Sequence, residues 1–245
     1  MATPVMLYIP NIIGYFRVAC MVVSFYLACG CTSGGPLACD TNDAPWELAI
    51  FVYTLNFAGD LVDGYAARAF NQCSKYGGVL DMVTDRTSTA GLCALLALLY
   101  PAEAFVYLSL IVLDIFSHWF HVVNAEALAK HHKAEQTSVF LTWYYGCYPL
   151  FAYCCVSQEF FYLSRWALRY SPALAMGPLS LAWASRYVFL PGCCMKQVVN
   201  VAQWWNAAGQ LAEADRVAAM ASNSRPRSPS PAHSPGPRRS ARKRI

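Results

Sequence analysis

Four aspartates between residues 60 and 85 have the side-chain type and the spacing for metal chemistry. Asp60 and Asp63 are three residues apart, and Asp81 and Asp85 are four apart, so each pair shares one face if its segment is helical. Four carboxylates so close together repel one another unless a cation shares the site. Because their hard oxygen donors favour Mg²⁺ or Mn²⁺ over Zn²⁺, all four are predicted to bind one of these two ions.

A pair of helices joined by a short turn must position these acids. Residues 71–75 are polar and few, which predicts an antiparallel hairpin whose two carboxylate pairs face each other. Gly64, Gly77 and Gly78 permit close approach of a backbone or a bulky ligand. Arg68 lies one turn beyond Gly64, where its guanidinium can neutralise a phosphate beside the metal.

The composition of the whole chain indicates a membrane protein. Hydrophobic residues make up 57% of the 245 residues and charged residues only 13%, with a mean hydropathy of +0.33, which points away from a soluble domain. No basic residue precedes the first apolar run, which Arg17 interrupts, so we expect no cleaved signal peptide. The predicted fold is an all-α polytopic membrane protein with six transmembrane helices. The predicted spans are residues 12–30, 46–68, 77–100, 103–124, 138–164 and 174–206.

The end of the chain differs in composition from the rest. Residues 221–245 are rich in Ser and Pro, lack acidic residues and carry seven basic ones. We predict a membrane domain over residues 1–220 and a disordered, basic cytosolic tail over residues 221–245, which is expected to meet the anionic leaflet of the lipid bilayer. Nucleic acid is not an expected partner, because no aromatic residue interleaves the basic ones.

The distribution of basic residues orients the predicted helices. The loop of residues 31–45 has two aspartates and no Lys or Arg, whereas basic residues lie in the turn at 71–76, in the loop at 126–136 and in the tail. The positive-inside rule places these basic segments and both termini in the cytosol. The carboxylates then lie near the cytosolic boundary, where a water-soluble substrate can meet a lipid one.

The spacing of these residues is also that of a known family. The pattern D-x2-D-G-x2-A-R-x8-G-x3-D-x3-D, which starts at residue 60, is matched at every fixed position and resembles the signature of the CDP-alcohol phosphotransferases. The resemblance implies that Asp60, Asp63 and Asp81 hold one or two divalent ions on a diphosphate and that Asp85 is the catalytic base. The residues implied in binding CDP-diacylglycerol are Asp60, Asp63, Gly64, Ala67, Arg68, Gly77 and Asn11.

Three further segments resemble the eukaryotic phosphatidylinositol synthases within that family. They are P-N-x2-G-x2-R from residue 10, LDMVTDR from residue 80 and L-D-x2-S-H-W from residue 113. The resemblance implies transfer of a phosphatidyl group from CDP-diacylglycerol to myo-inositol with release of CMP, by a homodimer in the endoplasmic reticulum membrane, with the Golgi also open. An uncharged polyol needs several directional donors and acceptors. The residues expected at the inositol are Thr84, Arg86, Asp114, His118 and Lys196.

The chain departs from those relatives at two places in the fifth segment. Tyr148 stands where they commonly carry an arginine, and Ser157-Gln158 stands where they commonly have Gly-Asn. Any role of that arginine therefore does not carry over to this chain.

Some residues have two interpretations from the sequence alone. Arg17 either contacts phosphate near the metal or snorkels to lipid headgroups, and Lys196 either faces the substrate cavity or snorkels. Asp114 and His118 either bind substrate or brace two helices. Glu159 is expected to be a buried pair partner.

Alternative functions also stay open. A sibling enzyme would use glycerol 3-phosphate, serine or another alcohol, because the core pattern fixes only the CDP end. A lipid prenyltransferase requires a second acidic cluster, which this chain lacks, and a cation transporter would use the carboxylates without chemistry.

One disulfide among Cys29, Cys31 and Cys39 is a further hypothesis.

Overall fold

The computed structural model describes residues 3–30, 45–131 and 138–223, and every regular element in these ranges is helical. The all-α prediction is therefore confirmed for the described residues. Cys31, Cys39 and residues 224–245 of the predicted tail lie outside these ranges. The long helices are α1 (Ile9–Gly30), α2 (Trp46–Ala69), α3 (Lys75–Leu99), α4 (Ala104–His131), α6 (Tyr148–Tyr170) and α8 (Leu190–Asn223). The short elements are η1 (Val5–Leu7), η2 (Pro101–Glu103), α5 (Val139–Gly146), η3 (Pro172–Ala175), α7 (Leu181–Ala184) and the π-helix η4 (Ser185–Phe189).

The first four long helices begin close to the predicted spans, and the turn between α2 and α3 has the expected local chemistry. Asn71 adopts a positive φ of 53°, a conformation that Asn tolerates better than most residues. Ser74 caps α3, because its side-chain oxygen accepts a hydrogen bond from the amide of Gly77 at 3.0 Å. The polar residues of this turn thus stop one helix and start the next.

The predicted fifth span is broken into two helices. α5 and α6 meet at an angle of 87°, with Cys147 between them. Pro149 explains the break, since its ring has no N–H to donate and would clash with the carbonyl of Tyr145 in a continuous helix. The break places Tyr148 at the start of α6, where its side chain is exposed.

The predicted sixth span is also irregular at its beginning. The π-helix η4 ends at Phe189, and Pro191 is the second residue of the helix α8 that follows it. A π-turn widens the helix where the proline leaves a carbonyl without its usual partner. From there α8 continues to Asn223, past the predicted end at residue 206 and into the first residues of the predicted tail.

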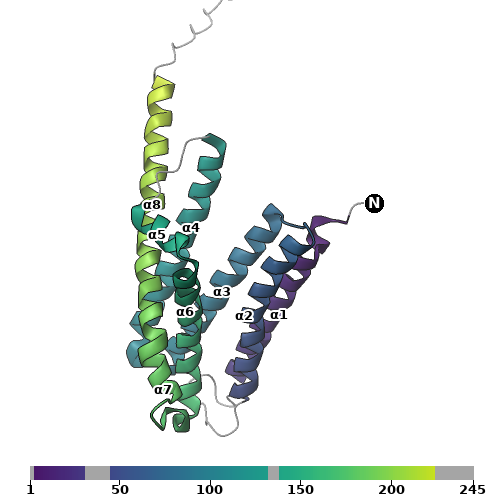
Figure 1. Ribbon diagram of the computed structural model, residues 1–245, viewed down its shortest axis with the longest axis vertical. Helices are drawn as coiled ribbons and strands as arrows, with labels where there is room; N and C mark the ends of the chain where they lie inside the picture. The colour runs from purple at the N-terminus through teal and green to yellow at the C-terminus, as the bar shows by residue number, and fades with distance from the viewer. Residues whose placement is uncertain (1–2, 31–44, 132–137, 224–245) are drawn as a thin grey trace, which may run out of the picture.

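Helix α1 joins the two parts of the bundle. It packs along α2 and also contacts α3, while α3, α4, α6 and α8 pack together as the larger part. α2 and α3 diverge from their shared turn instead of packing along each other, as Figure 1 shows. The turn is as predicted, and acids of α2 and α3 do face each other, since Asp60, Asp63 and Asp81 lie together. The two helices are held relative to each other by α1, which contacts both.

The apolar length of the helices indicates a membrane protein. Ile9–Cys29, Lys75–Leu99 and Pro101–Ala125 are long and apolar enough to cross a bilayer, and the bent pair of α5 and α6 makes a fourth if it counts as one span. Neither α2 nor α8 meets the same test among the described helices. Both carry buried polar side chains, such as Asp63 on α2 and Lys196 and Asn200 on α8, which lower their mean hydropathy.

A core of buried apolar side chains holds these helices together. Its largest members are Tyr53, Tyr162 and Trp166, each at most 1% exposed. α1 and α3 approach closely here, since a Cβ at Gly91 would lie 2.3 Å from a ring carbon of Phe25. This contact fixes the position of α1 relative to α3, and with it the arginine that α1 carries.

Candidate active site

A buried arginine from α1 joins the four aspartates. Arg17 is only 1% exposed. Its Nη1 donates to Asp63 at 2.6 Å and to Asp81 at 2.8 Å, while its Nη2 lies 3.1 Å from Asp60 and also donates to Asp85. One guanidinium therefore connects α1, α2 and α3 and offsets part of the negative charge of the four carboxylates.

Gly59 allows this arginine to cross the surface of α2. A Cβ at Gly59 would lie 2.7 Å from Cγ of Arg17, so a larger residue would displace the arginine side chain. The Nε of Arg17 is buried and has no hydrogen-bond partner among the described residues. The snorkelling interpretation of Arg17 is thus wrong, because its side chain turns toward the acids and not toward lipid headgroups.

Three of the four aspartates form a group that fits a divalent ion. Carboxylate oxygens of Asp60, Asp63 and Asp81 lie within 4.8 Å of one another, and hard donors of this kind suit Mg²⁺ or Mn²⁺. Asp85 lies outside this group of three, but Arg17 holds it beside the group. The donor set fits the predicted metal, with Asp85 at its margin.

A cavity of about 200 Å³ borders the carboxylates at the end of the bundle that carries the α2–α3 turn. Its walls are mostly small residues, which leaves room for a flat, bulky group close to the backbone. Arg68 does not line it, and its guanidinium nitrogens lie 3.7 Å from the position of a Cβ on Gly64. The lining includes Asn11, Asp63, Gly64, Ala67, Gly77 and Asp81, so it unites most of the residues predicted for the CDP group.

A second cavity, of about 430 Å³, lies on the other side of the carboxylates. Asp81 lines both cavities, whereas Asp60 and Asp85 line only this one. Of the residues predicted for inositol, three line it, namely Arg86, His118 and Lys196. The structure does not bring Thr84 to the cavity, because that hydroxyl donates to the carbonyl of Leu80 on its own helix.

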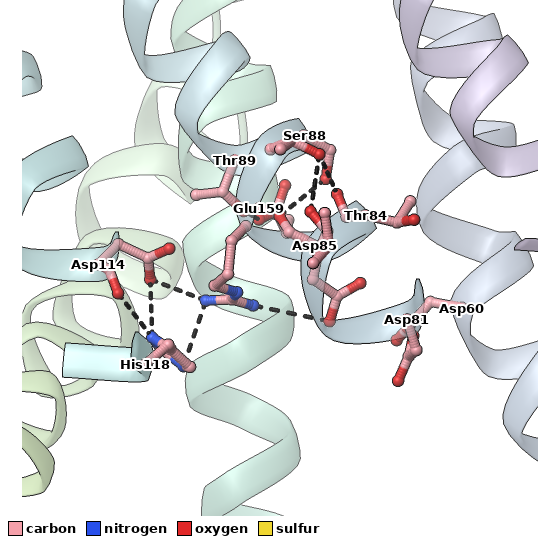
Figure 2. A network of polar contacts seen from close by, with 12 residues as sticks. Asp60, Asp81, Thr84, Asp85, Ser88, Thr89, Asp114, His118 and Glu159 are labelled. Carbon is pink, nitrogen blue, oxygen red and sulfur yellow. Dashed lines mark hydrogen bonds and ion pairs between the residues drawn. The ribbon is translucent and has the colours of Figure 1, made fainter. Parts of the chain in front are cut away.

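Asp114 stands behind the second cavity and orients two of its residues. Its Oδ1 accepts from Arg86 at 2.8 Å, and its backbone carbonyl lies 2.8 Å from Nδ1 of His118. The Nη1 of Arg86 is 3.3 Å from Nε2 of His118, and its Nη2 is 3.6 Å from Asp85. Figure 2 shows Asp114 and His118 on one side of this network and Asp85 on the other, toward Asp81. For Asp114 the bracing interpretation therefore fits the geometry, while His118 faces the cavity.

Lys196 reaches the same cavity from α8. It is 6% exposed, and its Nζ donates to Oδ1 of Asn200 at 2.9 Å. No carboxylate lies within ion-pair distance of it in the described part of the chain. Of the two interpretations of Lys196, the structure supports the one in which it faces the cavity, because its ammonium group is turned inward.

Sequence reasoning missed several residues of the second cavity. Asn56 lines it and is 1% exposed. A signal for Asn56 was present, since it precedes Asp60 by four residues and Asp63 by seven and so shares their helix face. Gln203 and Tyr145 also line the cavity and are hydrogen-bonded to each other across α5 and α8. No spacing along the chain could have indicated that pair, because the two residues lie far apart in sequence.

Glu159 is buried in the wall of the second cavity. Its two carboxylate oxygens accept hydrogen bonds from Tyr53 at 3.1 Å and from Thr89 at 2.8 Å. Glu159 is therefore buried and paired, but its partners are two neutral hydroxyl groups. No cation lies within ion-pair distance of its carboxylate among the residues described. Figure 2 shows Glu159 near Thr89 and Asp85. Tyr148 lines the same cavity.

Apolar helices long enough to cross a membrane, a group of carboxylates able to hold a divalent ion and two cavities that share Asp81 are the features of an integral-membrane enzyme. Residues 7–174 match the family model described as CDP-alcohol phosphatidyltransferase. The chain belongs to the CDP-alcohol phosphatidyltransferase family.

The chain is also similar to individual enzymes with a more specific name. The chain is 38% identical to CDP-diacylglycerol–inositol 3-phosphatidyltransferase 1 of Arabidopsis thaliana, over 83% of this chain and 88% of that protein. It is 34% identical to CDP-diacylglycerol–inositol 3-phosphatidyltransferase of Saccharomyces cerevisiae, over 87% and 90%. It is 32% identical to the human protein of that name, over 86% and 94%. No solved structure matches the chain significantly.

Proposed function

We propose that this protein synthesises phosphatidylinositol by transferring the phosphatidyl group of CDP-diacylglycerol to myo-inositol, with release of CMP. The observation that carries the proposal is the position of the carboxylate site between two cavities, with Asp81 in the lining of both. One cavity gathers the residues expected at the CDP group, and the other gathers polar residues suited to a polyol. The names of the curated relatives support the same pair of substrates.

In this proposal Asp60, Asp63 and Asp81 would hold one or two Mg²⁺ or Mn²⁺ ions at the diphosphate end of the site. When bound, the metal supplies positive charge that stabilises the leaving CMP. Asn11, Gly64, Ala67 and Gly77 form the nucleotide side of the site, and Arg68 lies beside Gly64 at its edge. Gly64 has no side chain and lines the cavity, so the cytidine diphosphate can approach the backbone of α2 closely there.

Asp85 is the proposed base. It takes the proton of the inositol hydroxyl, whose oxygen then attacks the phosphorus that carries the diacylglycerol. The bond from that phosphorus to the bridging oxygen breaks, and CMP leaves with the electron pair. Arg17 and Arg86 both contact Asp85, so they hold its carboxylate in place in the lining of the second cavity.

Arg86, His118 and Lys196 are the proposed inositol contacts in the second cavity. Arg86 and Lys196 donate hydrogen bonds, while the role of His118 as donor or acceptor depends on its tautomer. Asp114 positions Arg86 and His118 from behind. This mixture of directional groups suits a neutral polyol better than a single counter-ion would.

We further propose six membrane spans, with α2 and α8 as the two spans whose polar residues face the site. In Figure 1 the α2–α3 turn, the amino-terminal end of α1 and the carboxyl-terminal ends of α4 and α8 lie at the same end of the bundle. That arrangement supports a common cytosolic side for these segments and for the active site. An endoplasmic reticulum location, a homodimer and contact of the basic tail with the bilayer complete the proposal.

Release of CMP by the purified protein in detergent tests the function. The protein receives CDP-diacylglycerol, Mn²⁺ or Mg²⁺, and inositol, glycerol 3-phosphate or serine in separate reactions. We expect release with inositol alone. Release with another alcohol would overturn the acceptor assignment, and no release with any of the three, from protein shown to be folded, would overturn the transferase proposal.

A further inference from the structure

The wall of the second cavity next to Glu159 has an unusual balance of hydrogen-bonding groups. The hydroxyls of Tyr53 and Thr89 both donate hydrogen bonds to the carboxylate of Glu159, and the hydroxyl of Ser88 donates one to the backbone carbonyl of Asp85. These donors are therefore already in use. The acceptors are not, since each oxygen of Glu159 receives one hydrogen bond and a carboxylate can receive about four in all.

Asn56 adds a second open acceptor at the same wall. Its side chain is 1% exposed, it lines the cavity, and its Oδ1 has no hydrogen-bond partner within the described ranges. A buried acceptor without a partner costs free energy, as does a buried carboxylate with only neutral donors. Both costs are removed by a ligand that brings hydrogen-bond donors into the cavity.

We propose that Glu159 and Asn56 form the floor of the acceptor subsite and accept hydrogen bonds from two hydroxyl groups of an uncharged polyol. The proposal rests on the proposed transfer to inositol and assigns these two residues to the same site. A phosphorylated acceptor would bring negative charge toward Glu159, so the floor favours a neutral polyol over its phosphate ester.

The position of the floor agrees with the position of the base. Thr89, which donates to Glu159, follows Asp85 by four residues on α3 and so lies about 6 Å further along the helix axis. A polyol ring that presents one hydroxyl to Asp85 can therefore present others to Glu159 and Asn56. The floor would fix which hydroxyl of the ring reaches the base.

A purely structural role for Glu159 is the competing explanation. Its hydrogen bonds join α2, α3 and α6, because Tyr53, Thr89 and Glu159 come from these three helices. Bracing alone would alter folding or turnover with every acceptor equally. A contact with substrate would instead depend on one particular hydroxyl of that substrate.

The test compares the wild type with Glu159→Gln, using inositol and a set of inositols that each lack one hydroxyl. We expect Glu159→Gln to raise the KM for inositol about 10- to 100-fold, with the KM for CDP-diacylglycerol changed by less than about twofold. For the wild type, one deoxyinositol should have a much higher KM than inositol. For that compound Glu159→Gln should raise the KM little further, because the compound already lacks the hydroxyl that would donate to Glu159. Glu103→Gln, which removes a carboxylate paired with Arg165 far from the cavity, should leave both KM values unchanged.

Two results would overturn the floor. One is an equal and additive loss in Glu159→Gln with every deoxyinositol; the other is an unchanged KM for inositol. If Glu159→Gln does not fold, Asn56→Leu, which removes the free acceptor, must show the same selective loss with a different deoxyinositol. Absence of CMP release from the wild type with inositol would overturn both the proposed function and this subsite. If the wild type is active but the losses from the substitution and from each missing hydroxyl are additive, only the assignment of the floor is overturned.

Discussion

Replacement of Arg17 by glutamine tests the electrostatic account of the site. The change keeps a polar side chain but removes the cation that contacts Asp60, Asp63, Asp81 and Asp85. Removing one partner of a buried ion pair costs about 3–5 kcal/mol. For a protein of this size each kcal/mol shifts the Tm by about 2–4 °C. Without divalent metal, Arg17→Gln should therefore lower the Tm by roughly 6–20 °C.

The assay is thermal unfolding in detergent, followed by tryptophan fluorescence, with EDTA and with Mn²⁺. Mn²⁺ should raise the Tm of Arg17→Gln more than that of the wild type, because the metal then supplies the positive charge that the carboxylates have lost. Arg165→Gln is the matched control. Arg165 lies 2.5 Å from Glu103, away from the site and partly exposed, so its loss should be small and independent of Mn²⁺.

The reasoning is refuted if Arg17→Gln and the wild type unfold at the same temperature in EDTA. It is also refuted if the difference between them is the same with and without Mn²⁺. The first outcome would mean that the guanidinium does not offset the four charges, and the second that the metal and the arginine do not serve the same carboxylates.

Three other substitutions separate chemistry, substrate contact and packing. Asp85→Asn should lower kcat at least about 100-fold in the CMP-release assay while the KM for CDP-diacylglycerol stays within about twofold; full activity would exclude the base. Gly64→Ala should leave the Tm unchanged, because its Cβ would lie 3.7 Å from the nearest side-chain atoms, but should raise the KM for CDP-diacylglycerol; an unchanged KM would argue against nucleotide contact there. Gly91→Ala should lower the Tm, since its Cβ would lie 2.3 Å from the ring of Phe25 and such overpacking costs about 1–3 kcal/mol; an unchanged Tm would contradict the tight contact of α1 and α3.

The helical elements could be predicted because the signals for a helix and for a turn lie in neighbouring residues of the sequence. Apolar runs and polar turns lie within short windows, and the α2–α3 turn was found from residues 71–75 alone. The break before α6 also had a local signal in Pro149, although the predicted fifth span passed over it. Composition identifies an apolar segment but does not say whether one proline divides it.

The site was predictable only in part because much of it is assembled over long distances. The carboxylates follow a fixed spacing, whereas Arg17 is 46 residues away from Asp63 and its inward direction depends on how α1 packs. Thr84 has the right chemistry and the right neighbours in sequence, but its hydroxyl is bonded to its own helix. Side-chain direction and helix packing decide such cases, and neither is contained in spacing.

The presence of two cavities with one shared wall has a kinetic consequence. If each cavity holds one substrate, neither substrate needs to leave before the other enters, and both must be present when the phosphorus is attacked. Initial rates measured at several fixed inositol concentrations should then give intersecting lines in double-reciprocal plots, not parallel ones. CMP should likewise not exchange into CDP-diacylglycerol in the absence of inositol, because no residue of the enzyme has to carry the phosphatidyl group between two half-reactions.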